Sequence, residues 1–156
     1  MKDGIPQIDR RAYVYYMALG NSPAMLAQNV AYYLWTYKDA KSQPLLGENT
    51  YKLHIPPNVP AKQFWSVVVY DALSRSELQN GERFPSLSVY TGPKKNADGS
   101  VDIFFGPKVP TGEEKNWIRT ISDKGFFPMF RWYSQEKPLY DKTWQLPDVE
   151  EVNPWD

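Results

Sequence analysis

Apolar and polar positions change their spacing once along the chain, near residue 45. Before that point, apolar residues recur every three or four positions, which is typical of amphipathic helices. Asp9 can cap a helix over residues 10–19 that ends at Gly20, and Ser22-Pro23 can start a second helix. The apolar stripe of this second helix consists of Leu26, Val30, Tyr33, Leu34 and Tyr37. The first 45 residues therefore predict a helical hairpin.

From Tyr51 onward the period changes to two, which predicts β-strands. The run Gln63–Asp71 has a β-branched centre and suits a strand that is buried on both faces. Pro128 lies inside another strand and favours an edge position or a bulge for it. The predicted strands are residues 51–55, 63–71, 86–90, 100–105, 116–121 and 126–133, with a short final strand at 144–146.

Short strands separated by turns predict a fold that is mostly β, an antiparallel jelly-roll-like β-sandwich preceded by the helical hairpin. Asp98-Gly99, between two apolar runs, is a β-hairpin signal because glycine readily adopts positive φ. We expect three segments along the chain. They are a helical hairpin or connector at 1–45, the sandwich at 46–149 and an acidic tail at 150–156.

Charge and composition exclude several classes of function. Eighteen basic and eighteen acidic residues cancel and form no basic block, which argues against a nucleic-acid partner. The chain has no cysteine, so disulfides and thiol chemistry are excluded. No apolar run is long enough to predict a membrane span, and the N-terminus lacks the apolar core of a signal peptide. We expect a cytoplasmic location for a complete chain and a periplasmic or secreted one for a processed fragment.

Aromatic residues make up 15% of the chain, including six Trp and eleven Tyr. Tyr and Trp suit core edges and interfaces because each carries a polar tip on a large apolar body. In the expected second helix, Tyr33, Trp35 and Tyr37 occupy more than one face. These three residues are candidates for an interface with a companion domain or a second copy of the chain. The alternative is that they pack on the chain's own β-core. Exposed aromatic rings could also stack on a glycan.

Candidate chemistry is sparse. His54 is the one histidine of the chain, so it cannot build a two-histidine metal site, and as a base it would need an orienting carboxylate. Asp98 and Asp102 flank Ser100 and are candidate ligands for a hard cation such as calcium. Turn chemistry explains Asp98 equally well. We expect no cofactor.

Six polar residues lie within or beside otherwise apolar strands and are the catalytic candidates. They are Tyr70, Asp71, Arg75, Asn116, Arg131 and Tyr133. A tyrosine beside an arginine can act as an acid or a base in hydrolase or lyase chemistry, because the cation favours the phenolate. Each of these residues can equally form a buried structural hydrogen bond.

Five blocks along the chain carry a family resemblance. They are Phe64-Trp65-Ser66-(x)3-Tyr70-Asp71, Asn96-x-Asp98-Gly99-Ser100-(x)4-Phe105-Gly106-Pro107, Asn116-Trp117-Ile118, Arg131-x-Tyr133 and Trp144-x-Leu146-Pro147. Over Leu46–Val149 the chain resembles domain of unknown function 1214, which usually follows domain of unknown function 1254. The resemblance implies a jelly-roll-like sandwich, similar to viral coat and nucleoplasmin-type folds, and no established activity. Because full-length relatives carry two such domains, we expect a short member, a fragment or one half of a split pair. The expected function is association with itself, a companion subunit or a glycan, and the alternative is a hydrolase or lyase.

Overall fold

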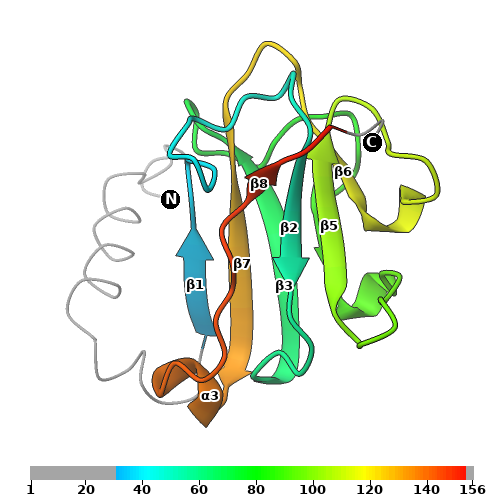
Figure 1. Ribbon diagram of the computed structural model, residues 1–156. Helices are drawn as coiled ribbons and strands as arrows, with labels where there is room; N and C mark the ends of the chain where they lie inside the picture. Colours follow the sequence, from blue (N-terminus) through cyan, green and yellow to red (C-terminus); the bar gives the residue numbers. More distant parts are fainter. Residues whose placement is uncertain (1–30, 154–156) are drawn as a thin grey trace, which may run out of the picture.

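The computed structural model describes residues 31–153, which form two four-stranded β-sheets (Figure 1). The first sheet has the order β1-β7-β3-β4, made of β1 (Ala31–Trp35), β7 (Phe126–Gln135), β3 (Ala61–Asp71) and β4 (Ser86–Ser88). The second has the order β6-β5-β2-β8, made of β6 (Trp117–Arg119), β5 (Val101–Gly106), β2 (Tyr51–Ile55) and β8 (Glu150–Glu151). Between residues 31 and 153 there are also three short helices: η1 (Val89–Thr91), η2 (Glu114–Asn116) and α3 (Lys137–Tyr140). The prediction of a mostly β fold is confirmed.

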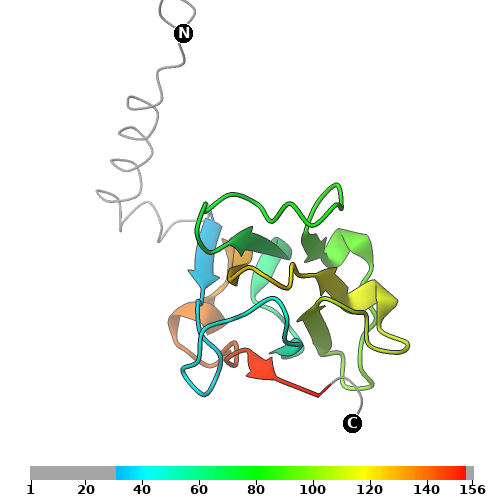
Figure 2. The ribbon, with the colours of Figure 1, turned by 90° about the horizontal axis from the view of Figure 1, so that it is seen from above.

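The core lies between the two sheets. From Trp65 onward, every second residue of β3, including Val67, points toward β2 and β5, whose Ile55 and Ile103 are fully buried. Phe130 and Trp132 of β7 join the same cluster. Seen from above, β8 lies at the periphery beside β2, so residues 150–151 are joined to the second sheet (Figure 2).

The paired strands of residues 31–153 are antiparallel, except that β5 and β6 pair in parallel. The expected all-antiparallel pattern is corrected at this point. A parallel pair needs a connection that returns the chain to the starting end of the first strand. Here residues 107–116, with η2 at their end, make that return.

The helical expectation is wrong for residues 31–35, because Ala31–Trp35 forms β1 and pairs with β7. Tyr33, Trp35 and Tyr37 also fit a period of two, and aromatic residues favour strands. Pairing decides the conformation: Tyr32 packs on the ring of Trp132, with centroids 5.7 Å apart, and Leu34 lies opposite Phe130. The rest of the predicted hairpin, residues 1–30, lies outside the described residues.

Pro128 does not mark an edge strand, because β7 lies between β1 and β3. Val69 directs its backbone groups away from β7, since its N–H donates to Pro85 and its carbonyl accepts from Leu78. Val69 and Pro128 are therefore a pair without ladder hydrogen bonds, and the nitrogen of Pro128 faces the β1 side. Because the pairing of β1 ends at Trp35, opposite Met129, the proline removes no ladder bond there.

Two further expectations fail near turns. Asp98-Gly99 does form a tight turn, with Gly99 at φ +85°, but β4 and β5 on either side belong to different sheets and form no hairpin. Residues 144–146 form no strand. Trp144 instead packs into the core, and its indole N–H donates to the carbonyl of Pro57 at 3.0 Å. No helix between residues 31 and 153 is long and apolar enough to cross a membrane.

Candidate functional site

The outward side of the β1-β7-β3-β4 sheet is covered by aromatic residues, and we call it the aromatic face. Side chains alternate between the two sides of a strand, so every second residue points away from the core. The face consists of Tyr33 and Trp35 on β1, every second residue from Phe64 to Tyr70 on β3, and every second residue from Phe127 to Tyr133 on β7. Tyr37 and Tyr90 extend it at its two ends, where they contact Phe127 and Phe64.

Ring contacts join these residues into two groups. In the first, Phe64 and Tyr133 stack with centroids 4.2 Å apart and planes 14° apart, and Tyr33 and Tyr90 flank them. In the second, Tyr70 stacks on Phe127 at 5.2 Å, and Tyr37 lies against Phe127 at 4.7 Å. Each ring of the two groups therefore packs against at least one other aromatic ring.

Antiparallel sheets in water usually alternate apolar residues inside with polar residues outside. This sheet departs from that pattern, because Val68 and Phe127 on its outward side are 5% and 4% exposed. Around them, Trp35, Tyr37 and Tyr90 remain 50%, 36% and 76% exposed. Aromatic residues are enriched at interaction surfaces relative to the rest of a protein surface.

Arg131 occupies the middle of the aromatic face. In the strand register it lies between Tyr33 of β1 and Ser66 of β3. Its Nη2 donates to the phenolic oxygen of Tyr70 at 3.1 Å. Its Nε is buried and has no hydrogen-bond partner among residues 31–153. The Arg131 side chain is thus partly buried among the aromatic and aliphatic side chains of the face.

Of the six catalytic candidates, the structure brings three together on the aromatic face: Tyr70, Arg131 and Tyr133. Arg75 lies at its rim, where the guanidinium donates to the hydroxyl of Tyr37 and stacks over its ring at 4.8 Å. Asp71 and Asn116 do not belong to this group. The interface candidates Tyr33, Trp35 and Tyr37 lie on the aromatic face, at the spacing of a strand.

Asp71 ends β3 on the inward side and organises the turn that follows. Its Oδ1 accepts the backbone N–H groups of Leu73 and Ser74, and its Oδ2 contacts the ammonium of Lys124 at 2.9 Å. The hydrogen bond from Ser74, followed by that from Lys124, lowers the pKa of Asp71 to about 2. These contacts explain Asp71 as a structural residue.

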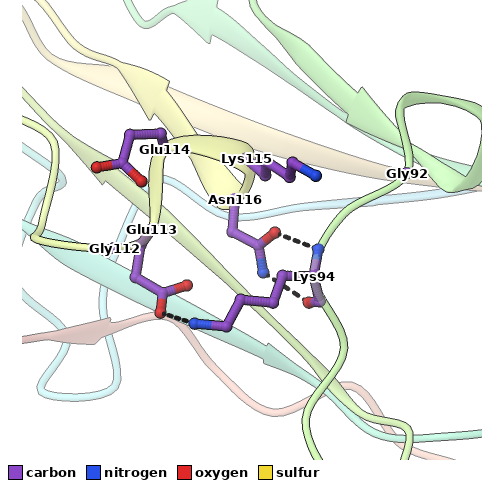
Figure 3. Close-up of a pocket in the computed structure, with 7 residues that line it drawn as sticks. All are labelled: Gly92, Lys94, Gly112, Glu113, Glu114, Lys115 and Asn116. Atoms are coloured by element: carbon purple, nitrogen blue, oxygen red, sulfur yellow. Dashed lines mark hydrogen bonds and ion pairs between the residues drawn. The ribbon is translucent and has the colours of Figure 1, made fainter.

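Asn116 belongs to a separate cavity of about 390 Å³ between two loops (Figure 3). Its amide accepts from the backbone N–H of Lys94 at 2.7 Å and donates to the Lys94 carbonyl at 2.9 Å. The same amide donates to the carbonyl of Asp102 at 2.8 Å. Lys94 pairs with Glu113 at 2.8 Å, and this hydrogen bond raises the pKa of Lys94. Asn116 therefore clamps two loops together.

The candidate cation ligands have other partners. Asp98 accepts the hydroxyl and the backbone N–H of Ser100, and the hydroxyl bond is the main cause that lowers the pKa of Asp98. Asp102 contacts His54 at 2.6 Å and accepts from Asn96 at 2.9 Å. Within residues 31–153, no three His, Asp or Glu side chains are grouped as a metal site.

Sequence reasoning missed Phe64, Ser66, Val68 and Phe127 as members of the site. The signal was present, because residues 64–70 and 126–133 carry large apolar side chains at both odd and even positions. A run of this kind marks a strand covered on both sides. The orienting carboxylate for His54 could not be found in the same way, since Asp102 lies 48 residues away.

The fold and this face define a mostly β protein of two sheets, one of which is apolar on both sides. The chain belongs to the family described as "Protein of unknown function (DUF1214)", whose model matches residues 30–137. None of the curated proteins is similar enough to count as a relative.

Two solved structures share the fold. The VPA0106 protein from Vibrio parahaemolyticus is 23% identical with a TM-score of 0.70, over 90% of this chain and 35% of that one. An uncharacterized protein from Burkholderia cenocepacia is 17% identical with a TM-score of 0.59, over 80% of this chain and 30% of that one. The chain thus matches about a third of the length of these proteins.

Proposed function

We propose that this chain is a jelly-roll-like β-sandwich that works by association, and that its aromatic face packs against a companion domain or subunit. The observation that carries the proposal is the apolar character of the β1-β7-β3-β4 sheet on both sides. One side is covered by the second sheet. On the other, half-exposed Trp35 and exposed Tyr90 surround buried Val68 and Phe127.

The composition of the face fits protein association. Residues that dominate binding energies at interfaces are enriched in Trp, Tyr and Arg, and they cluster near the centre of the contact. On this face, Arg131 is central and Trp35, Tyr37 and Tyr90 surround it. A buried aromatic side chain contributes about 150–250 Å² of contact area, so a few such residues can anchor a partner.

The length of the similar structures favours a companion as the occupant. This chain matches 35% of one and 30% of the other, so about two thirds of each lies outside the matched part. We propose that a polypeptide corresponding to that remainder covers the aromatic face. A second copy of this chain and a glycan are the competing occupants.

Site-directed photo-cross-linking in the cells that make the chain tests the proposal. The photoreactive residue p-benzoylphenylalanine replaces Trp35 in one variant and Leu73 in the control, because Leu73 is 94% exposed in the turn after β3. We expect a specific adduct at position 35, identified by mass spectrometry as a polypeptide that carries the remainder of the relatives' fold. Capture of any other protein does not support the proposal.

Three results would overturn it: an adduct with a second copy of the chain, an adduct with a glycan, or equal labelling at both positions. A binding measurement with the purified companion completes the test. Trp35→Ser should weaken binding by about tenfold or more, and Leu73→Ser should leave it unchanged. Both residues are at least half exposed, so circular dichroism should show that both variants fold.

A second candidate function, hydrolase or lyase chemistry, is favoured by one contact, the hydrogen bond from Arg131 to the Tyr70 hydroxyl at 3.1 Å. Turnover of ester, amide or glycoside substrates should then be lost in Tyr70→Phe. Turnover that survives Tyr70→Phe would remove this candidate.

A further inference from the structure

We propose that Arg131 is a carboxylate-binding residue, and that it pairs with an aspartate or glutamate side chain of the companion when the aromatic face is covered. This inference rests on the proposed function and adds the chemistry of the partner. It requires that Arg131 be central on the face, partly removed from water and without an acidic partner of its own.

Arg131 differs from the other arginines of the described residues in its burial. Arg75, Arg83 and Arg119 are exposed, and each lies over an aromatic ring. Arg131 is only partly exposed, and its Nε is buried. Partial removal of a cation from water costs free energy unless charged or polar groups replace the lost hydration.

Residues 31–153 supply few polar groups to replace the hydration that Arg131 loses. A guanidinium has five N–H donors, and one of them bonds to Tyr70. Within residues 31–153, Arg131 forms no ion pair, and its Nε has no acceptor. A carboxylate is the acceptor that best matches the planar guanidinium, because it can take two parallel hydrogen bonds.

The aromatic rings on both sides of Arg131 strengthen an ion pair between its guanidinium and a carboxylate of the companion. On one side Tyr133 stacks on Phe64, and on the other Tyr70 stacks on Phe127. A partner that covers these rings also excludes water from the guanidinium between them, and the attraction between opposite charges increases as water is excluded. A pair formed in this way fixes the orientation of the partner on the sheet.

Charge also decides between a companion and a second copy of the chain. The outward residues of β3 from Phe64 to Tyr70 and of β7 from Phe127 to Tyr133 include no carboxylate. Two copies packed face to face about a two-fold axis would bring two Arg131 side chains toward each other at the centre. Like charges juxtaposed at an interface are unfavourable. The carboxylate must therefore come from a different surface.

The first test uses the companion identified by cross-linking and four forms of this chain: wild type, Arg131→Met, Arg131→Lys and Arg119→Met. Arg119 is the matched control because it lies over Trp117 on the other sheet, with 5.5 Å between guanidinium and ring centre. We expect Arg131→Met to bind about 30-fold more weakly or worse, Arg131→Lys to recover part of the loss, and Arg119→Met to bind like wild type. Thermal unfolding of each variant confirms that it folds.

If Arg131→Met binds like wild type while Trp35→Ser does not, association stands and the role of Arg131 is overturned. A second test needs no companion, so it judges Arg131 even if the proposed function fails. The Nε–H resonance of Arg131 is followed by NMR while one of three compounds is added. N-acetylglutamate amide represents a glutamate side chain, glucuronate represents an acidic glycan, and inorganic phosphate represents another anion. A saturable shift with N-acetylglutamate amide, with no matching shift at Arg119, supports the inference. Absence of any shift, or a stronger response to glucuronate or phosphate, overturns it.

Discussion

His54 and Asp102 lie directly opposite each other on β2 and β5, with Nδ1 of the imidazole 2.6 Å from a carboxylate oxygen. The pair is partly exposed on the sheet that does not carry the aromatic face, so its contribution to stability should be small. We expect His54→Gln to lower the free energy of unfolding by less than about 1 kcal/mol, measured by urea denaturation. Cross-linking through position 35 should not change. A loss of cross-linking in this variant would contradict the separation of the two surfaces.

Asp71 should make stability depend on pH at the acid end. Its pKa is about 2 in the folded chain and 3.8 ordinarily, so the folded state favours the ionised carboxylate. This stabilisation is present above pH 3.8 and is lost as the pH falls toward 2. Asp71→Asn should therefore be less stable than wild type at pH 7, by about 1–3 kcal/mol, with a smaller difference near pH 2.

Urea denaturation at a series of pH values checks the effect of Asp71→Asn. Asp123→Asn is the control, because Asp123 is exposed on the loop beside Lys124. A constant difference between Asp71→Asn and wild type across this range would show that the carboxylate charge has no role in the turn.

Gly47 should not tolerate a side chain. An added Cβ would lie 2.0 Å from the carbonyl oxygen of Ile121, which is backbone and cannot rotate away. Gly47 is fixed there from both sides, since its N–H donates to Lys124 at 2.8 Å and its carbonyl accepts from Thr120 at 2.6 Å. We expect Gly47→Ala to cost about 3 kcal/mol or more in thermal unfolding, while Glu48→Ala next to it changes little. A wild-type melting temperature for Gly47→Ala would contradict this packing.

Gaining a backbone N–H at position 128 should matter little, whereas losing one at position 129 should matter greatly. Pro128→Val restores an N–H that points beyond the paired part of β1, so we expect a change of less than about 1.5 kcal/mol. Met129→Pro removes an N–H from the ladder with Val68 and should prevent folding. Urea denaturation measures the change in Pro128→Val, and circular dichroism and solubility show whether Met129→Pro folds. A folded Met129→Pro would show that the assigned register is wrong.

The sequence predicted most strands because their signals are local. Residues 51–55 alternate between large apolar and polar side chains, and β2 has the predicted bounds. The β-branched run of β3 and the turn at Gly99 were likewise visible, since both depend on neighbouring residues. Residues 31–37 fit a helix and a strand equally well, and only pairing with β7 decides between them.

The candidate site was predictable in its residue types and not in its grouping. Tyr70, Arg131 and Tyr133 stood out as polar groups in apolar strands, yet Asp71 and Asn116 stood out for the same reason. What separates them is side-chain direction and strand order, and these depend on which strands become neighbours. The contact between Arg131 and Tyr70 spans 61 residues, so no local pattern predicts it.

The β1-β7-β3-β4 sheet has a consequence for the cell. A chain with apolar residues on both sides of a sheet is prone to aggregate while one side is uncovered. Exposed aromatic residues are also bound by chaperones, proteases and other unfolding chains. Under the proposed function, copies made in excess of the companion have no partner to cover this surface. The abundance of this chain should therefore follow that of its companion. Because of this one surface, the cell has to make the two in matched amounts.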